Sequence, residues 1–125
     1  MKKKILYLSI LGVVVLMLNS CYKDVIYPDF DPNAPVSFNG ELVPIFVKNC
    51  ADAGCHDAIP AHKPALTADK AYNAIKSGGY IDLLIPEQSK IYSMVKSGEM
   101  PPSGALTPAD AQRILNWIKA GAPNN

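Results

Sequence analysis

Hydrophobic residues recur with the 3.6-residue period of an α-helix in four segments, and no segment alternates over five residues as a strand does. The last segment is the clearest. Its apolar stripe at i, i+3, i+4 and i+7 is made by Ala111, Ile114, Leu115 and Ile118. Thr107 and Pro108 supply an N-cap and a first-turn proline, and Gly121 supplies a stop. This helix should turn its polar side chains to water, namely Gln112, Arg113, Asn116 and Lys119.

A first helix is expected over 41–50, with Asn39 as its N-cap and Pro44 tolerated near its first turn. One face of this helix carries Leu42, Ile45, Phe46 and Asn49. A neighbouring face carries Val43, Val47 and Cys50 at i, i+4 and i+7.

Two further helices are expected, over 68–77 after Thr67 and over about 87–97 after Pro86. In the first of them, Tyr72 and Ile75 should point inward. Each helix ends in Lys-Ser-Gly, which places a cation near the negative end of the helix dipole. We expect Gly78 and Gly98 to take the left-handed C′ position.

The fold class predicted from this pattern is all-α, a small bundle of about four short helices over residues 38–123. A domain of this size buries little apolar surface and is often stabilised by a metal or a cofactor. Side chains that could hold a metal or a cofactor are therefore of particular interest in this sequence.

The N-terminus has the features of an export signal. Lys2, Lys3 and Lys4 precede a 14-residue apolar run from Ile5 to Leu18, which is shorter than a bilayer-spanning helix. Leu18-Asn19-Ser20-Cys21 follows and resembles a bacterial lipobox. This resemblance implies a signal peptide over 1–20 and lipidation of Cys21; an ordinary signal peptide with an incidental cysteine is the alternative.

Residues 21–37 contain three prolines without a hydrophobic period, so they are expected to form an extended tether between the lipid and the domain. The lipid would anchor the protein in a membrane of a Gram-negative bacterium, on the periplasmic side or on the outer-membrane surface. Without residues 1–20, nine basic residues stand against eleven acidic ones, a net charge of −2. A nucleic-acid partner, which needs a basic surface, is excluded.

The chemistry-bearing segment is Cys50-Ala51-Asp52-Ala53-Gly54-Cys55-His56. Two thiols beside an imidazole are what a c-type haem requires, although the usual spacing is C-x-x-C-H. The two additional residues need a bulge, for which Ala51, Ala53 and Gly54 are small or flexible enough. Two alternatives stay open at this point: a disulfide between Cys50 and Cys55, and a zinc site that adds His56 and His62.

Export of the protein and the cysteine count favour haem, because Cys21 would carry lipid and no cysteine is left over. A second axial ligand is available in Gly98-Glu99-Met100-Pro101-Pro102, where two prolines stiffen the loop. The chain then resembles the class I monohaem cytochromes c, more narrowly the planctomycete-type domains and their lipoprotein relatives. The resemblance rests on residues 44–56, 85–102 and 106–122.

The resemblance implies that Cys50 and Cys55 form thioethers to one covalent haem c, that His56 is the proximal iron ligand and that Met100 is the distal one. Two other residues compete for the distal position: Met94, which has the spacing of a core residue, and His62. The family orients the proximal imidazole with a proline carbonyl, for which Pro60 and Pro64 are both candidates. Trp117 is expected to pack where the first and last helices cross, rather than to donate to a haem propionate.

His/Met ligation leaves no vacant position on the iron, so the expected function is electron transfer between redox partner proteins rather than catalysis. One alternative is a haem sensor or a peroxidase-like subunit with a labile distal Met100. Another is a haem-free lipoprotein interaction module stapled by a disulfide.

Overall fold

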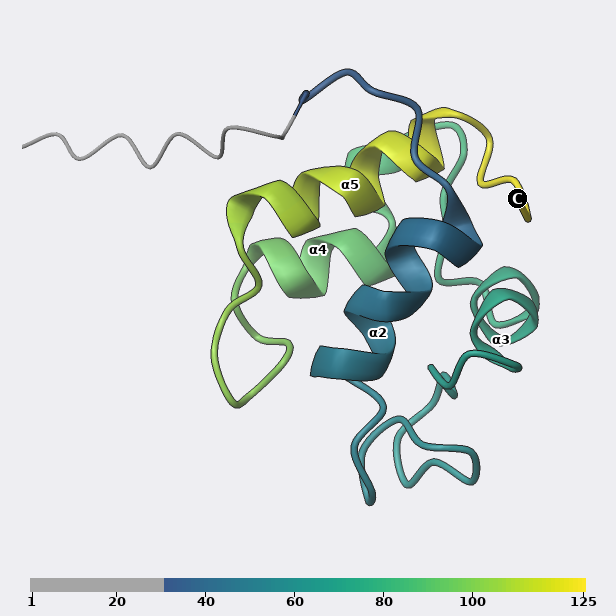
Figure 1. The fold of residues 1–125 in the computed structure, drawn as a ribbon, viewed down its shortest axis with the longest axis vertical. Helices are drawn as coiled ribbons and strands as arrows, with labels where there is room; N and C mark the ends of the chain where they lie inside the picture. Colours follow the sequence, from purple (N-terminus) through teal and green to yellow (C-terminus); the bar gives the residue numbers. More distant parts are fainter. Residues whose placement is uncertain (1–30) are drawn as a thin grey trace, which may run out of the picture.

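The computed structural model describes residues 31–125. The predicted signal peptide, Cys21 and residues 22–30 lie outside the described residues. Helices are the only regular secondary structure of the described part, which contains no strand (Figure 1). Its four α-helices are α2 (Val43–Asn49), α3 (Ala71–Ser77), α4 (Lys90–Lys96) and α5 (Pro108–Lys119). A π-helical turn, η1 (Phe38–Leu42), precedes α2, and a 3₁₀ turn, η2 (Pro86–Gln88), precedes α4. The all-α prediction is confirmed.

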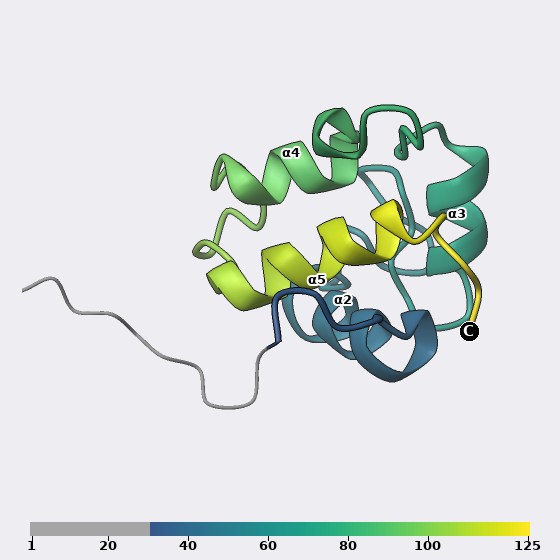
Figure 2. The same cartoon turned by 90° about the horizontal axis from the view of Figure 1, so that it is seen from above.

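Helix α5 begins as predicted, because the Thr107 hydroxyl accepts a hydrogen bond of 3.1 Å from the Asp110 amide. It lies between η1–α2 and α4, and the view from above shows this layering (Figure 2). Its predicted stripe is buried at Ile114, Leu115 and Ile118, and Trp117 is buried beside it. The prediction that its polar face is open to water holds fully only for Lys119.

The other three polar residues of α5 are partly covered, and two of them, Arg113 and Asn116, hold neighbouring segments. Arg113 pairs with Asp110 at 2.8 Å and with Glu41 of η1 at 3.5 Å. The Asn116 amide donates to the carbonyl of Pro32 at 2.6 Å. These bonds fasten the N-terminal part of the domain to its last helix.

The first helix starts earlier than predicted, and its cap is Ser37 rather than Asn39. The Ser37 hydroxyl accepts from the Gly40 amide at 3.0 Å, and Glu41 accepts from the Ser37 amide at 2.9 Å. This is a reciprocal capping arrangement whose acid comes one residue later than usual, because the first turn is π-helical. The π-helical turn η1 is thus wider than an α-helical turn, and it ends just before α2, in which Pro44 is the second residue.

The second and third helices, in contrast, begin later than the pattern suggested. The Thr67 carbonyl accepts hydrogen bonds from the amides of Lys70 and Ala71, so a turn precedes α3, which begins at Ala71. The 3₁₀ turn η2 occupies the first residues of the predicted third helix. Gly98 has the expected positive φ, 78°. Gly78 does not: its φ is −83°, and Gly79 takes the left-handed position with φ 70°. The prediction for Gly78 is therefore wrong by one residue.

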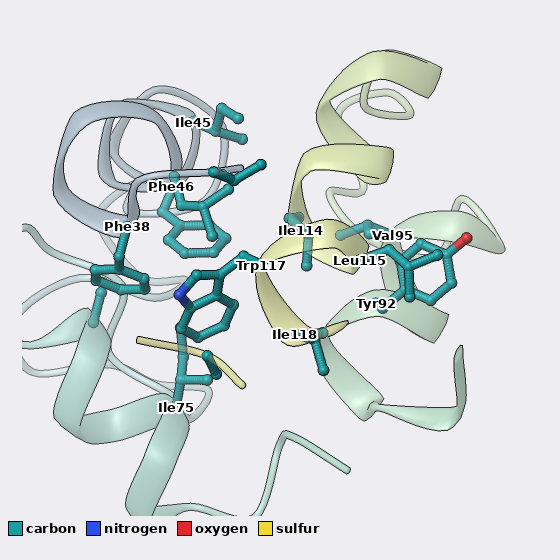
Figure 3. Packing of buried hydrophobic residues seen from close by; sticks show 14 of the residues in the cluster. Phe38, Ile45, Phe46, Ile75, Tyr92, Val95, Ile114, Leu115, Trp117 and Ile118 are labelled. Atoms are coloured by element: carbon teal, nitrogen blue, oxygen red, sulfur yellow. The ribbon is translucent and has the colours of Figure 1, made fainter. Parts of the chain in front are cut away.

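The core is centred on aromatic rings from both ends of the chain (Figure 3). The Trp117 ring centroid lies 5.0 Å from that of Phe38 and 6.5 Å from that of Tyr72. Its indole Nε1 donates to the carbonyl of Pro123 at 2.8 Å. Trp117 thus packs where η1 and α5 meet, as predicted.

The two ends of the described chain meet at the start of η1. The Phe38 amide donates to the Asn125 side chain, and the Asn39 amide to the Asn125 carbonyl, both at 2.8 Å. Val36 is buried with the core, so close packing begins within the segment assigned to the tether. Among residues 31–125, no helix combines the length and the apolar character needed to cross a bilayer.

Candidate cofactor site

A cavity of about 610 Å³ opens between the α2–α3 loop and α4. This volume is within the range of small-molecule and cofactor sites, about 300–1,000 Å³. Its apolar walls come from α2, the α2–α3 loop and α4, and include Phe46, Leu66, Ile91 and Val95. The four predicted haem-binding residues also line it: Cys50, Cys55, His56 and Met100. Residues up to 50 positions apart in sequence therefore meet at one cavity.

The His56 ring is held in a defined orientation. Its Nδ1 lies 2.8 Å from the carbonyl oxygen of Pro64. Because a carbonyl oxygen only accepts, Nδ1 carries the proton in this bond, and in the neutral ring the lone pair is on Nε2. Of the two proline carbonyls considered, the structure selects that of Pro64. The backbone of His56 is fixed as well, since its carbonyl accepts from the Leu66 amide at 2.8 Å.

Cys50 directly follows α2, where its amide donates to the Phe46 carbonyl at 2.8 Å. Burial raises the pKa of its thiol to about 11, and the nearby Asp52 carboxylate adds to this shift. Cys50 is therefore a neutral thiol at physiological pH. As a free thiol it is therefore a poor nucleophile.

The four residues between the cysteines form a compact turn. The Cys55 amide donates to the Asp52 carbonyl at 3.0 Å, and Gly54 has a φ of 81°. Asp57 accepts from the Gly54 amide at 3.2 Å and closes the turn from the other side. Cys55 is exposed at the cavity edge and Cys50 is half-buried, and neither is in a disulfide in the structure. The longer spacing thus still brings both thiols to one cavity.

Two methionines line the cavity. Met100 lies in the loop after α4, and its amide donates to the Met94 carbonyl at 3.1 Å. Its side chain also packs against the core, beside the buried Pro101. Met94 is half-buried in the cavity wall and is not part of the buried core cluster, so its interpretation as a core residue needs correction.

His62 lies at the cavity edge and is exposed. Its amide donates to the Cys55 carbonyl at 3.2 Å, which keeps it on the same loop as His56. Within residues 31–125, no three His, Cys, Asp or Glu side chains are grouped as metal ligands. The four candidate zinc ligands are therefore not assembled in this structure.

Tyr80 and Lys90 are among the polar cavity residues that the sequence analysis did not single out. One signal was available, because Lys90 is the first residue of α4 and a cation at that end opposes the helix dipole. Comparison with known proteins gives no further guide: no family model, no curated protein and no solved structure matches this chain. What the site can bind has to be argued from its own residues.

Proposed function

We propose that the protein is a lipid-anchored monohaem cytochrome c that carries electrons between redox partner proteins. The observation that carries this proposal is the single cavity lined by Cys50, Cys55, His56 and Met100. Cys50, Cys55 and His56 are close in sequence, but nothing in the spacing required Met100 to line the same cavity.

The residues around the cavity fit a haem in three respects. The donor set combines an imidazole nitrogen and a thioether sulfur, the His/Met pair of c-type cytochromes. The apolar walls suit the porphyrin faces. The two cysteines can each add S–H across a vinyl group, forming one C–S and one C–H bond without an oxidant. Haem bound in this way would supply one-electron transfer between Fe(III) and Fe(II).

The residues of this chain would set the properties of that site. The Pro64 carbonyl holds the Nδ1 proton of His56, which fixes the ring and leaves Nε2 as the ligating nitrogen. Phe46 and Val95 are buried residues of the wall and exclude water, which favours the reduced, less charged state. Met100 would fill the last coordination position, so that small ligands have no vacant site.

The proposal also includes the anchor. Lipidation at Cys21 would hold the domain at a membrane, on the periplasmic side or on the outer-membrane surface. The chain between Cys21 and the packed domain would raise the effective concentration of the domain near membrane-bound redox partners.

The test is the absorption spectrum of the exported full-length protein, oxidised and then reduced with dithionite, before and after acid–acetone extraction. A sharp reduced α band that survives extraction is expected for covalent haem c. A far-red sulfur-to-iron band should be present in the oxidised protein. A colourless protein would contradict the proposal.

Met100→Ala and Met94→Ala form a matched pair, because both methionines line the same cavity. Met100→Ala should keep the haem and lose the far-red band, whereas Met94→Ala should keep both. The reverse result would move the distal ligand to Met94. Rapid binding of carbon monoxide by the reduced, unmutated protein would contradict electron transfer and favour a gas-binding or peroxide-reactive haem.

A further inference from the structure

Tyr80 and Lys90 place polar groups in the wall of a mostly apolar cavity. Tyr80 lies in the loop between α3 and α4, and Lys90 begins α4. The Lys90 ammonium is 5.9 Å from the centroid of the Tyr80 ring. The Ile91 amide donates to the Tyr80 carbonyl at 3.2 Å, so the two segments are joined through the backbone as well.

Gly78 determines where the Tyr80 ring can lie. A Cβ at position 78 would collide with the Tyr80 ring and lie 2.6 Å from the Ala74 carbonyl oxygen. With a φ of −83°, this glycine is not required by its backbone conformation. The missing side chain is instead what leaves room for the ring.

A haem brings two carboxylates into its site, on the part of the macrocycle away from the thioether-forming vinyl groups. Such anions need a cation or hydrogen-bond donors when they are removed from water. The Trp117 indole is unavailable, because its Nε1 already donates to Pro123. Lys63 also lines the cavity, but it follows His62, whose amide is bonded to Cys55. We therefore assign Lys63 to the side of the cavity on which Cys55 would be attached to the haem.

We propose that Lys90 and the Tyr80 hydroxyl bind the propionate carboxylates of the haem, and that Gly78 is a positioning residue acting through the Tyr80 ring. The inference rests on the proposed function. It assigns the propionates to cavity residues that come from neither the loop of His56 nor the loop of Met100.

The test compares Lys90→Gln with Lys96→Gln in the exported protein. Lys96 is the matched control, since it is exposed on the same helix and its ammonium lies 5.5 Å from the Tyr92 ring centroid, but it does not line the cavity. Loss of a cation beside the carboxylates destabilises the reduced iron. Lys90→Gln should therefore shift the equilibrium with a redox mediator toward Fe(III), by about threefold to tenfold. Lys96→Gln should leave it nearly unchanged.

A second readout detects the carboxylates themselves. Tyr80→Phe should shift the carboxylate bands in the oxidised-minus-reduced infrared difference spectrum, and Gly78→Ala should shift the same bands by displacing the ring. Covalent haem c with equal redox equilibria in Lys90→Gln and Lys96→Gln, and with unchanged carboxylate bands in Tyr80→Phe, would overturn the inference and leave the proposed function standing. Protein without covalent haem would overturn both.

Discussion

Replacing Trp117 by alanine should remove much of the stability of the domain. Trp117 is fully buried against the rings of Phe38 and Tyr72, which also contact each other. Truncating a buried tryptophan costs about 3–5 kcal/mol through lost contacts and the cavity left behind. The Pro123 carbonyl also loses its indole donor, which costs about 1 kcal/mol more. We expect a total loss of about 4–6 kcal/mol.

This loss is large for a domain of this size. At about 0.05–0.15 kcal/mol per residue, the 95 described residues correspond to a free energy of unfolding of about 5–14 kcal/mol. Trp117→Ala should therefore remove between about a third and all of this free energy. Trp117→Phe keeps an aromatic ring in the cluster and loses the hydrogen bond and part of the packing, so it should cost about 1–3 kcal/mol.

The assay is urea unfolding of the exported protein followed by far-UV circular dichroism, with the midpoint and the slope fitted separately. Tyr72→Phe is the control: it removes only a hydroxyl, which bonds to the Ala122 carbonyl at 3.2 Å, and should cost about 1 kcal/mol or less. The reasoning is refuted if Trp117→Ala destabilises the protein no more than Tyr72→Phe does.

Three smaller predictions concern the ends of helices and one surface ion pair. Ser37→Ala removes the cap of the first helix and should lower the free energy of unfolding by about 1 kcal/mol in the same urea assay. Ser89→Ala leaves the Asp82 amide without the buried hydroxyl that accepts its hydrogen bond at 2.9 Å, and should cost about 1–3 kcal/mol; no change would contradict that bond. The hydrogen bond from Lys119 lowers the pKa of Glu87, so this pair stabilises the fold above the unfolded-state pKa and stops doing so as the pH falls through the folded-state value. Glu87→Gln should accordingly be slightly less stable than the unmutated protein near neutral pH and equally stable in acid, as measured by thermal unfolding across pH.

The helices were predictable where local signals agreed. In α5, the cap, the first-turn proline and the apolar stripe all point to the same element, and its start is as predicted. The start of the first helix was missed because the π-helical turn separates Ser37 from Glu41 by one residue more than the usual capping pattern. A position of that kind depends on how the turn packs against the rest of the fold, which a local pattern does not contain.

The residues of the candidate site also fall into two groups, those that the sequence indicated and those that depend on the folded chain. Cys50, Cys55, His56 and Met100 could be selected because their chemistry is unusual for a chain of this composition. The choice of Pro64 over Pro60 depends on the path of the loop, which only the folded chain defines. Tyr80 had no motif to mark it, and Lys90 had only its place at the start of α4, since both become cavity residues only when the chain folds.

The joined ends of the domain determine how a pull on its N-terminal segment would be transmitted. Residues 31–37 lie at the opposite end of the molecule from the α2–α3 loop (Figure 1). Tension on this segment would reach α5 through the Pro32–Asn116 bond and η1 directly through the backbone, and the bonds from Phe38 and Asn39 to Asn125 would pass it on to the C-terminus. The loop that carries the cysteines and His56 is outside this path. A pull on residues 31–37, such as an anchor at Cys21 would exert under the proposed function, would therefore act first on η1 and α5 rather than on the loop that carries the cysteines and His56.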